Sequence, residues 1–201
     1  MNEVDLHSYY ASQAAYGSSK HHNLLLSKGY QQDPSLSSYN YRTYHRPDRT
    51  IVSYKGTNPL HISDLKADIA IGTGTHKSNP EFQKAFLTAK QAKEKYKNQI
   101  ITTGHSLGGT KAIEAANAIN AQSVAFNPGT GIKGLETSKH KVYVNEGDII
   151  AARTKGTNIT KVKGTVLTPL KSHSLNSFEN TFQPKRQRFA HLRKKRYINK
   201  F

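Results

Sequence analysis

The chain has 201 residues, of which 35% are hydrophobic, and this length allows one domain with a sizeable core but not two. It contains no cysteine, which excludes disulfide bonds and thiolate metal sites. Its 30 lysines and arginines outnumber 13 acidic residues and give a formal net charge of +17, which attracts polyanions such as nucleic acid, anionic lipid or an acidic partner.

The sequence also bears on where the protein acts. No stretch approaches the roughly 18 to 20 consecutive apolar residues that a membrane-spanning helix needs. Residues 1–17 contain two early acids and no long apolar segment, so we expect no secretory signal. We therefore expect an intracellular or virion-associated protein that is soluble or peripheral to membranes.

One helix, a long loop and two short strands are predicted over residues 4–71. Apolar residues recur at spacings of three and four over residues 4–16, which predicts a helix that ends near Gly17. Residues 17–48 are rich in serine, tyrosine and histidine, and we expect mostly loop there. Short strands are predicted at residues 51–54 and 68–71, because each apolar run is followed by glycine-containing turn residues.

Helix and strand patterns alternate in the middle of the chain. A helix is predicted over residues 81–97, with a proline near its first position and an acid in its first turn. A strand at 100–103, a helix through 112–119 and strands at 123–126 and 142–145 follow. This alternation predicts an α/β fold with a mostly parallel central sheet that is covered by helices.

The sequence Gly-His-Ser-Leu-Gly-Gly at residues 104–109 connects a predicted strand to a predicted helix. A serine between two glycines at such a turn is the G-x-S-x-G pattern of a nucleophile elbow. The glycines lack the Cβ atoms that would collide across the turn, and the helix directs its first amides and its positive dipole end at the serine. We predict Ser106 as a nucleophile and the Leu107 N–H as an oxyanion donor.

A serine nucleophile needs an acid that orients its base. In this architecture the residues follow the chain order serine, acid, histidine. Asp148 follows the predicted strand 142–145 and so lies past a carboxyl end, where the sites of open sheets gather. Glu146 is two residues closer to that strand and is the alternative, as is a structural role for Asp148 in capping the loop.

Two histidines, His173 and His191, follow the acid in the sequence. His173 comes after a strand-like run and turn at residues 165–170, so its loop can reach over the end of the sheet. His191 lies in a strongly basic stretch, which disfavours a protonated imidazole without orienting it. We predict His173 as the general base, and we expect His105 to be a packing or hydrogen-bonding residue.

A second oxyanion donor must come from another loop. Residues 54–57 end an early strand, and their glycine allows a close backbone approach. Thr57 offers both a main-chain N–H and a hydroxyl. An ordinary turn at the end of the strand is the alternative interpretation.

Five sequence blocks in this order resemble the class 3, or fungal-type, lipase family of α/β-hydrolases, and the resemblance covers most of residues 5–178. The blocks are Tyr-Lys-Gly-Thr at 54–57, with Lys55 in place of the family's arginine, Gly-His-Ser-Leu-Gly-Gly at 104–109, Phe-Asn-Pro-Gly-Thr-Gly at 126–131, Val-Asn-Glu-Gly-Asp-Ile-Ile at 144–150 and His-Ser-Leu at 173–175. The resemblance implies an α/β-hydrolase-like fold with Ser106, Asp148 and His173 as the catalytic triad. It also implies Thr57 and Leu107 as the oxyanion-hole residues.

The resemblance further implies that the protein hydrolyses the carboxylic esters of glycerolipids or phospholipids through an acyl-enzyme. Neither a metal nor an organic cofactor is expected. Residues 58–80 offer little apolar surface for a membrane-facing lid, and the chain has no tryptophan. We therefore expect no strong interfacial activation.

The last 18 residues differ in character from the rest. Residues 184–201 hold eight lysines and arginines and no acid, so we divide the chain into a lipase-like domain at 1–183 and a basic tail. Such a tail can be simply solvated, or it can bind an anionic membrane, nucleic acid or an acidic partner, or direct the protein to the nucleus. Two alternatives to an active enzyme are a catalytically weak lipase-like binding protein and a virion or nucleic-acid-associated basic protein.

Overall fold

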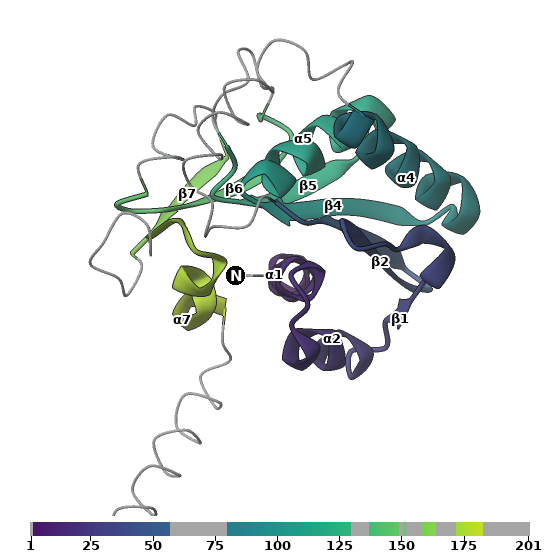
Figure 1. Ribbon diagram of the computed structural model, residues 1–201, viewed down its shortest axis with the longest axis horizontal. Coiled ribbons are helices and arrows are strands. Elements are labelled where there is room, and N and C mark those ends of the chain that lie inside the picture. The colour runs from purple at the N-terminus through teal and green to yellow at the C-terminus, as the bar shows by residue number, and fades with distance from the viewer. Residues whose placement is uncertain are drawn as a thin grey trace, which may run out of the picture.

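In the part of the chain that the structure describes, a sheet of seven strands separates two layers of helices (Figure 1). The computed structural model describes residues 2–56, 80–129, 137–148, 151, 158–163 and 172–182. The strands lie side by side in sequence order from β1 to β7. The first three pair antiparallel and the remaining pairings, from β3 to β7, are parallel. The predicted α/β fold with a mostly parallel sheet is confirmed.

The elements have the following bounds. The strands are β1 Gln31–Gln32, β2 Tyr41–Arg46, β3 Arg49–Tyr54, β4 Gln99–His105, β5 Gln122–Phe126, β6 Lys141–Asn145 and β7 Ile159–Val162. The helices are α1 Glu3–Ala15, α2 Ser19–Leu26, α4 Pro80–Tyr96, α5 Leu107–Ile119 and α7 Glu179–Phe182, with short 3-10 helices η1 Pro34–Leu36 and η4 Leu175–Phe178.

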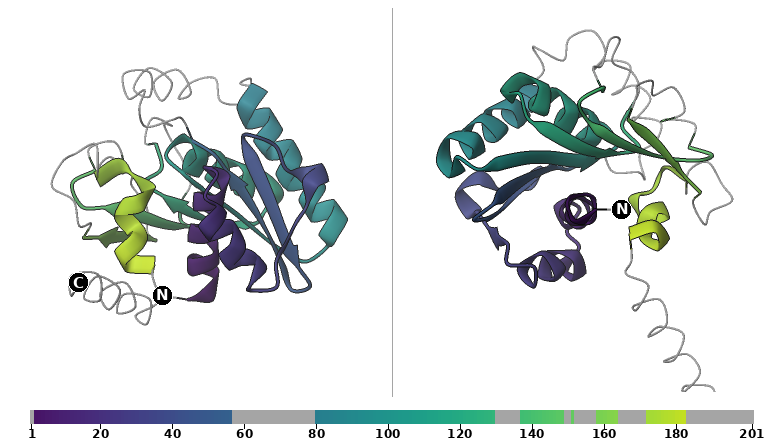
Figure 2. Two further views of the ribbon diagram at one scale, coloured as in Figure 1. Left: turned by 60° about the horizontal axis from the view of Figure 1, so that its bottom comes forward. Right: turned by 180° about the vertical axis from the view of Figure 1, so that it is seen from behind.

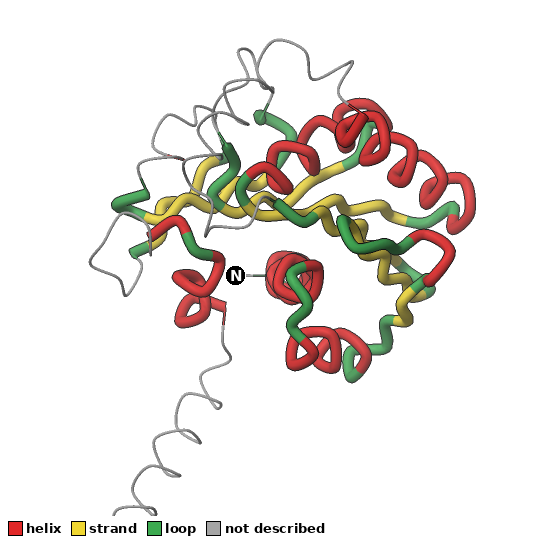
Figure 3. Tube along the Cα trace, viewed as in Figure 1, coloured by secondary structure: helices red, strands yellow, loops and turns green. Residues whose placement is uncertain are grey.

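Helices cover both faces of the sheet. Helices α4 and α5 lie on one face, and α1, α2 and α7 lie on the other (Figures 1 and 2). Right-handed crossovers between parallel neighbours explain the first pair, since α4 stands between β3 and β4 in the chain and α5 between β4 and β5. Figure 3 shows the same layers, with the short helical segment η4–α7 beside α1 under the strands.

Strand β4 is buried on both faces, and its alternating side chains explain its polar residues. The Thr102 hydroxyl donates to a carbonyl of α5 at 2.6 Å, on one face. The Thr103 hydroxyl lies 3.0 Å from a serine hydroxyl of α1, on the other face. Because successive strand residues point to opposite faces, His105 points to the α1 side and Gly104 faces α5.

An aromatic cluster on the α1 side anchors the end of the described chain. Phe182 of α7 stacks on Tyr9 of α1 with ring centroids 4.9 Å apart, and Phe126 of β5 stacks on Tyr143 of β6 at 5.6 Å. Phe178 and Phe182 are both completely buried. Since η4 and α7 directly follow residue 173, this packing holds the segment that carries His173 against the sheet.

Most of the predicted elements are confirmed, with bounds that differ by one or two residues except at the start of one helix. These are the helices at 4–16, 81–97 and 112–119, the last of which begins earlier, at residue 107, and the strands at 51–54, 100–103, 123–126 and 142–145. The strands predicted at 68–71 and 165–170, the stretch 58–79 and the basic tail lie outside the described residues. In the part of the chain that the structure describes, no helix is long and apolar enough to cross a membrane.

The prediction of loop for residues 17–48 is wrong. This stretch contains α2, β1, η1 and β2. All six residues of β2 pair with β3, from Tyr41 opposite Tyr54 to Arg46 opposite Arg49, so the partner strand stabilises a sequence with little strand pattern of its own. Helix α2 has only eight residues, too few to be stable alone, and depends on packing against α1 through buried Leu25.

Two buried histidines of the α1–α2 layer predict an acid-sensitive fold. Burial is the largest cause that lowers the pKa of His7 and of His21 from 6.5 to about 4 in each case. Between these values the unfolded chain binds protons that the folded protein excludes, so the free energy of unfolding falls as the pH drops from 6.5 towards 4. The slope reaches up to about 1.4 kcal/mol per pH unit for each histidine. Urea unfolding across this range measures it.

The variants His7→Gln and His21→Gln test the origin of this slope. Each is expected to make the stability less dependent on pH in this window. An unchanged slope in both variants would contradict the assignment.

Candidate active site

Ser106 occupies the turn between β4 and α5 in a conformation that is unfavourable for a non-glycine residue. Its φ is 57° and its ψ is −129°. The surrounding backbone holds this conformation from both sides. The Ser106 N–H donates to the carbonyl of Phe126 in β5 at 3.1 Å, and the Ser106 carbonyl accepts from the N–H groups of Gly109 and Thr110 at 2.9 and 3.2 Å.

Three glycines allow backbone segments to touch at this turn. A Cβ atom on Gly104 would lie 2.3 Å from the Gly108 carbonyl oxygen, and one on Gly108 would lie 2.2 Å from the Tyr54 carbonyl oxygen. A Cβ atom on Gly56 would lie 2.4 Å from the His105 carbonyl oxygen. The end of β3 therefore packs directly against the turn that presents Ser106, with no side chain between them.

The structure brings the three predicted side chains together in one hydrogen-bonded chain. His173 Nε2 lies 2.9 Å from Ser106 Oγ, and His173 Nδ1 lies 2.8 Å from Asp148 Oδ2. Each of the three residues is at most 2% exposed. A carboxylate can only accept, so Nδ1 carries the proton that donates to Asp148. The lone pair of a neutral imidazole is then on Nε2, where it accepts from the serine hydroxyl.

Asp148 is positioned by the turn that follows β6. Its N–H donates to the Asn145 carbonyl at 3.1 Å, and its Oδ1 accepts from the Ala151 N–H at 3.2 Å. Glu146, the alternative acid, is exposed, and its N–H donates to the Val162 carbonyl of β7 at 2.8 Å. The contact with His173 is therefore made by Asp148. His191, the alternative base, lies outside the described residues.

Two asparagines hold the backbone of the histidine loop. Asn127 Nδ2 donates to the carbonyls of Ser172 and His173 at 3.0 and 3.3 Å, and Asn145 Nδ2 donates to that of Ser172 at 2.9 Å. Asn127 directly follows β5 and Asn145 ends β6. Neither asparagine was predicted as a site residue, although polar residues at the carboxyl ends of two adjacent strands are a signal for this edge of the sheet.

The expectation that His105 is a hydrogen-bonding residue is confirmed. His105 is only 2% exposed, and its Nε2 lies 2.5 Å from the carbonyl oxygen of His173. Its Nδ1 lies 3.1 Å from the hydroxyl of Tyr16, the residue that follows α1. Tyr16 was not found from the sequence, because it lies 89 positions away from His105 along the chain.

Of the two predicted oxyanion residues, the structure describes Leu107 but not Thr57. Leu107 is the first residue of α5, where backbone N–H groups have no partner within the helix. Thr57 lies outside the described residues. The residue before it, Gly56, approaches the Ser106 turn closely, since a Cβ atom there would lie 3.2 Å from the Gly108 nitrogen.

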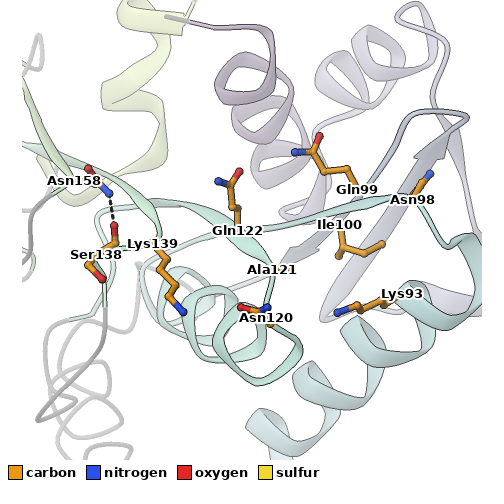
Figure 4. A pocket seen from close by; sticks show the side chains of 10 residues that line it. All are labelled: Lys93, Asn98, Gln99, Ile100, Asn120, Ala121, Gln122, Ser138, Lys139 and Asn158. Carbon is orange, nitrogen blue, oxygen red and sulfur yellow. Dashed lines mark hydrogen bonds between the residues drawn. The ribbon is translucent and has the colours of Figure 1, made fainter.

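A separate cavity opens at the other edge of the sheet (Figure 4). Its volume is about 590 Å³, and the amino ends of β4 and β5 contribute to its wall with Lys93, Lys139 and several amide side chains. Ser106 follows the carboxyl end of β4, so this cavity does not belong to the triad. Within the described ranges, no group of three or more histidine, aspartate or glutamate side chains could hold a metal ion.

A comparison with protein-family models identifies the family. Residues 9–194 match a phospholipase-like family, described as the Tle-like phospholipase domain. The chain belongs to this family. No curated protein matches it significantly. The phospholipase-like protein is thus an ester hydrolase of the lipase and phospholipase type, and the match covers all three side chains of the hydrogen-bonded chain. It does not distinguish the class 3 type, and it extends past the domain boundary predicted at residue 183.

The glycine contacts predict a graded effect of added Cβ atoms. Gly104→Ala and Gly108→Ala place a Cβ atom within 2.3 Å of a backbone oxygen, whereas the nearest atom for Gly109→Ala is 3.1 Å away. We expect the first two to lower the free energy of unfolding by several kcal/mol, on the order of 3, and Gly109→Ala to lower it by about 1 kcal/mol. Thermal and urea unfolding measure the series. Equal effects at all three positions would contradict the packing at the turn.

Proposed function

We propose that this phospholipase-like protein hydrolyses the carboxylic esters of glycerolipids or phospholipids, with Ser106 as nucleophile, His173 as general base and Asp148 as orienting acid. The observation that carries the proposal is the buried chain of two hydrogen bonds, at 2.9 and 2.8 Å, between these side chains. The strained φ of Ser106 supports the assignment of the turn as a nucleophile elbow.

Acylation follows from the direction of these hydrogen bonds. As Ser106 Oγ forms its bond to the acyl carbonyl carbon, its proton passes to His173 Nε2. Asp148 stabilises the resulting imidazolium through Nδ1. When the tetrahedral intermediate collapses, the bond to the alcohol oxygen breaks, and His173 returns the proton to that leaving oxygen.

Deacylation repeats these steps with water. His173 removes a proton from a water molecule, and the oxygen of that water attacks the acyl-enzyme. The collapse of the second intermediate releases the fatty acid and gives the proton back to Ser106. All proton transfers in both halves of the reaction are made by groups of this chain, so no metal or organic cofactor is needed.

The negative charge of each intermediate falls beside the amino end of α5. The Leu107 N–H and the positive end of the helix dipole favour an oxyanion at this position. We assign the second donor to Thr57, whose neighbour Gly56 packs against the same turn. Each donor is expected to lower the barrier by about 3 kcal/mol. The order of the five motif blocks supports the class 3 lipase type within the broader family.

The charge of the protein suggests where the substrate is found. A net charge of +17, with eight basic side chains in the tail, favours binding to an anionic lipid surface. The same clusters, Lys-Arg-Gln-Arg and Arg-Lys-Lys-Arg, favour nucleic acid or an acidic partner as a second ligand of the tail. We propose an intracellular or virion-associated location, peripheral to membranes, with the tail as a further nuclear-targeting signal.

Substitution of the triad tests the proposed chemistry. Ser106→Ala and Asp148→Asn are each expected to lower kcat for fatty acyl esters by about 10⁴-fold. The first variant lacks the nucleophile, and the second no longer holds His173 in the tautomer that accepts the serine proton. The measurement is hydrolysis of a panel of glycerolipid, phospholipid and short-chain esters. Ser123→Ala, at another buried serine in β5, is the matched control and is expected to keep its activity.

Labelling with a fluorophosphonate separates an enzyme from a catalytically weak binding protein. Wild type and Ser123→Ala are expected to react, and Ser106→Ala is not. Full hydrolysis by Ser106→Ala, or no labelling of the wild type, would overturn the proposed mechanism.

Recruitment to anionic bilayers predicts a salt-dependent activity. Hydrolysis is expected to be faster on phosphatidylcholine vesicles that contain phosphatidylglycerol than on phosphatidylcholine alone, because each basic residue near the surface contributes about 1 kcal/mol. High salt is expected to remove the difference by screening. A variant with the eight basic tail residues replaced by glutamine is the comparison for the intact chain.

Equal rates on both vesicles at low salt would contradict recruitment. If the tail variant loses binding to duplex DNA but hydrolyses vesicles like the wild type, the tail serves nucleic acid rather than the lipid surface.

A further inference from the structure

A partly buried set of hydrogen bonds beside the triad joins four segments that are distant in sequence. The Gly56 N–H donates to the Tyr16 hydroxyl oxygen at 3.1 Å. That hydroxyl lies 3.1 Å from His105 Nδ1, and His105 Nε2 lies 2.5 Å from the His173 carbonyl oxygen. The set therefore runs from the segment after β3, through the residue after α1 and the end of β4, to the loop that carries His173.

The chemistry of the groups fixes the direction of each bond. Burial, and then the nearby His173, lower the pKa of His105 to about 3, so this imidazole is neutral near pH 7. A carbonyl oxygen can only accept, so Nε2 of His105 carries the proton. Nδ1 then has a lone pair and accepts from the Tyr16 O–H. The Tyr16 oxygen accepts from the Gly56 N–H. Each group in the set therefore donates to the next, from Gly56 through Tyr16 and His105 to the His173 carbonyl.

One end of this set lies just after β3, at Gly56. The Tyr16 hydroxyl fixes the peptide N–H of Gly56, the residue immediately before Thr57. The same glycine has no room for a side chain, since a Cβ atom would lie 2.4 Å from the His105 carbonyl oxygen and 2.7 Å from the Tyr16 hydroxyl. Tyr16 thus holds the backbone of Gly56 against the turn that carries Ser106.

The other end lies at the proposed base. The rings of His105 and His173 have centroids 4.9 Å apart. A proton gained by His173 meets no charge on a neutral His105, so the neighbouring ring does not oppose the imidazolium. The hydrogen bond from Nε2 reaches the main chain of His173 and leaves both of its ring nitrogens to Ser106 and Asp148.

We propose that Tyr16 and His105 are positioning residues: Tyr16 holds Gly56, the residue before the proposed oxyanion donor Thr57, and His105 holds the main chain of His173, each relative to Ser106. The inference rests on the proposed function, since it assumes that Ser106 and His173 carry out the reaction. Tyr16 acts through the backbone of Gly56, and His105 acts through the backbone of His173. Neither residue exchanges a proton with the substrate.

Tyr16→Phe removes the hydroxyl and keeps the ring, which meets His105 edge-on at 5.8 Å. We expect kcat for a soluble ester to fall about 10- to 100-fold with little change in KM, because the substrate binds normally but its transition state is misaligned. The rate of inactivation by a fluorophosphonate, which forms a tetrahedral adduct, is expected to fall in parallel. Active sites are counted by the final extent of labelling.

Tyr10→Phe is the matched control. Tyr10 belongs to the preceding helix α1, is 3% exposed and packs in the core on the same side of the sheet. Its loss of a hydroxyl is expected to leave kcat and the inactivation rate per labelled site unchanged. Thermal unfolding of both variants reports any change in stability separately from these rates.

Variants of His105 test the second half of the set. His105→Gln keeps a donor that can reach the His173 carbonyl, whereas His105→Leu has none, so the glutamine variant is expected to retain more of kcat. The Tyr16 hydroxyl is oriented by its hydrogen bond to His105 Nδ1, so His105→Leu already disturbs it. Adding Tyr16→Phe to His105→Leu is therefore expected to lower kcat less than twofold further. Fully multiplicative losses would contradict a coupled set.

The outcomes distinguish this inference from the proposed function. If the wild type hydrolyses esters and Ser106→Ala does not, the function holds, and equal kcat per labelled site in Tyr16→Phe and Tyr10→Phe then overturns the positioning role alone. A loss confined to thermal stability, with kcat per labelled site unchanged, overturns it as well. If the wild type shows no hydrolysis or labelling, the proposed function itself fails.

Discussion

The direct backbone contact between the end of β3 and the turn at Ser106 is the constraint on which the site depends. Gly56, Gly104 and Gly108 each lie where a Cβ atom would come within 2.4 Å of a backbone oxygen. Such close backbone contacts are possible only where side chains are absent. The strained φ of Ser106 is tolerated because hydrogen bonds from β5 and α5 hold the residue on both sides. This turn directs the Ser106 hydroxyl toward Nε2 of His173.

The parallel sheet then explains how the remaining groups meet. Ser106 follows β4, Asn127 follows β5 and Asp148 follows β6, so the shared direction of the strands delivers all three to the same edge. The histidine arrives from a different part of the chain and needs anchors of its own. Asn127 and Asn145 bind its main chain, while the aromatic core packs against the helices that follow it. The loop that carries the imidazole is thus held by the ends of β5 and β6 and by the helices that follow it.

Two histidines lie beside each other at this edge and differ in their partners. His173 contacts a carboxylate and a hydroxyl, which suits an imidazole that gains and loses a proton. His105 contacts a carbonyl and a tyrosine hydroxyl in a fully buried setting, which lowers its pKa and keeps it neutral. Two chemically identical side chains at this edge therefore differ in their partners, since only His173 is paired with a carboxylate.

The sequence alone determined the α/β class, most helices and strands of the described chain and the candidate residues Ser106, Asp148 and His173. These features depend on local periodicity, on glycines around one serine and on the order of residue types along the chain. Only the tertiary structure placed Asp148 rather than Glu146 against His173, formed β2 and α2 from weakly patterned segments, and joined Tyr16 to His105 across 89 positions. Such contacts depend on how distant segments pack together, and no local pattern of residues encodes that packing.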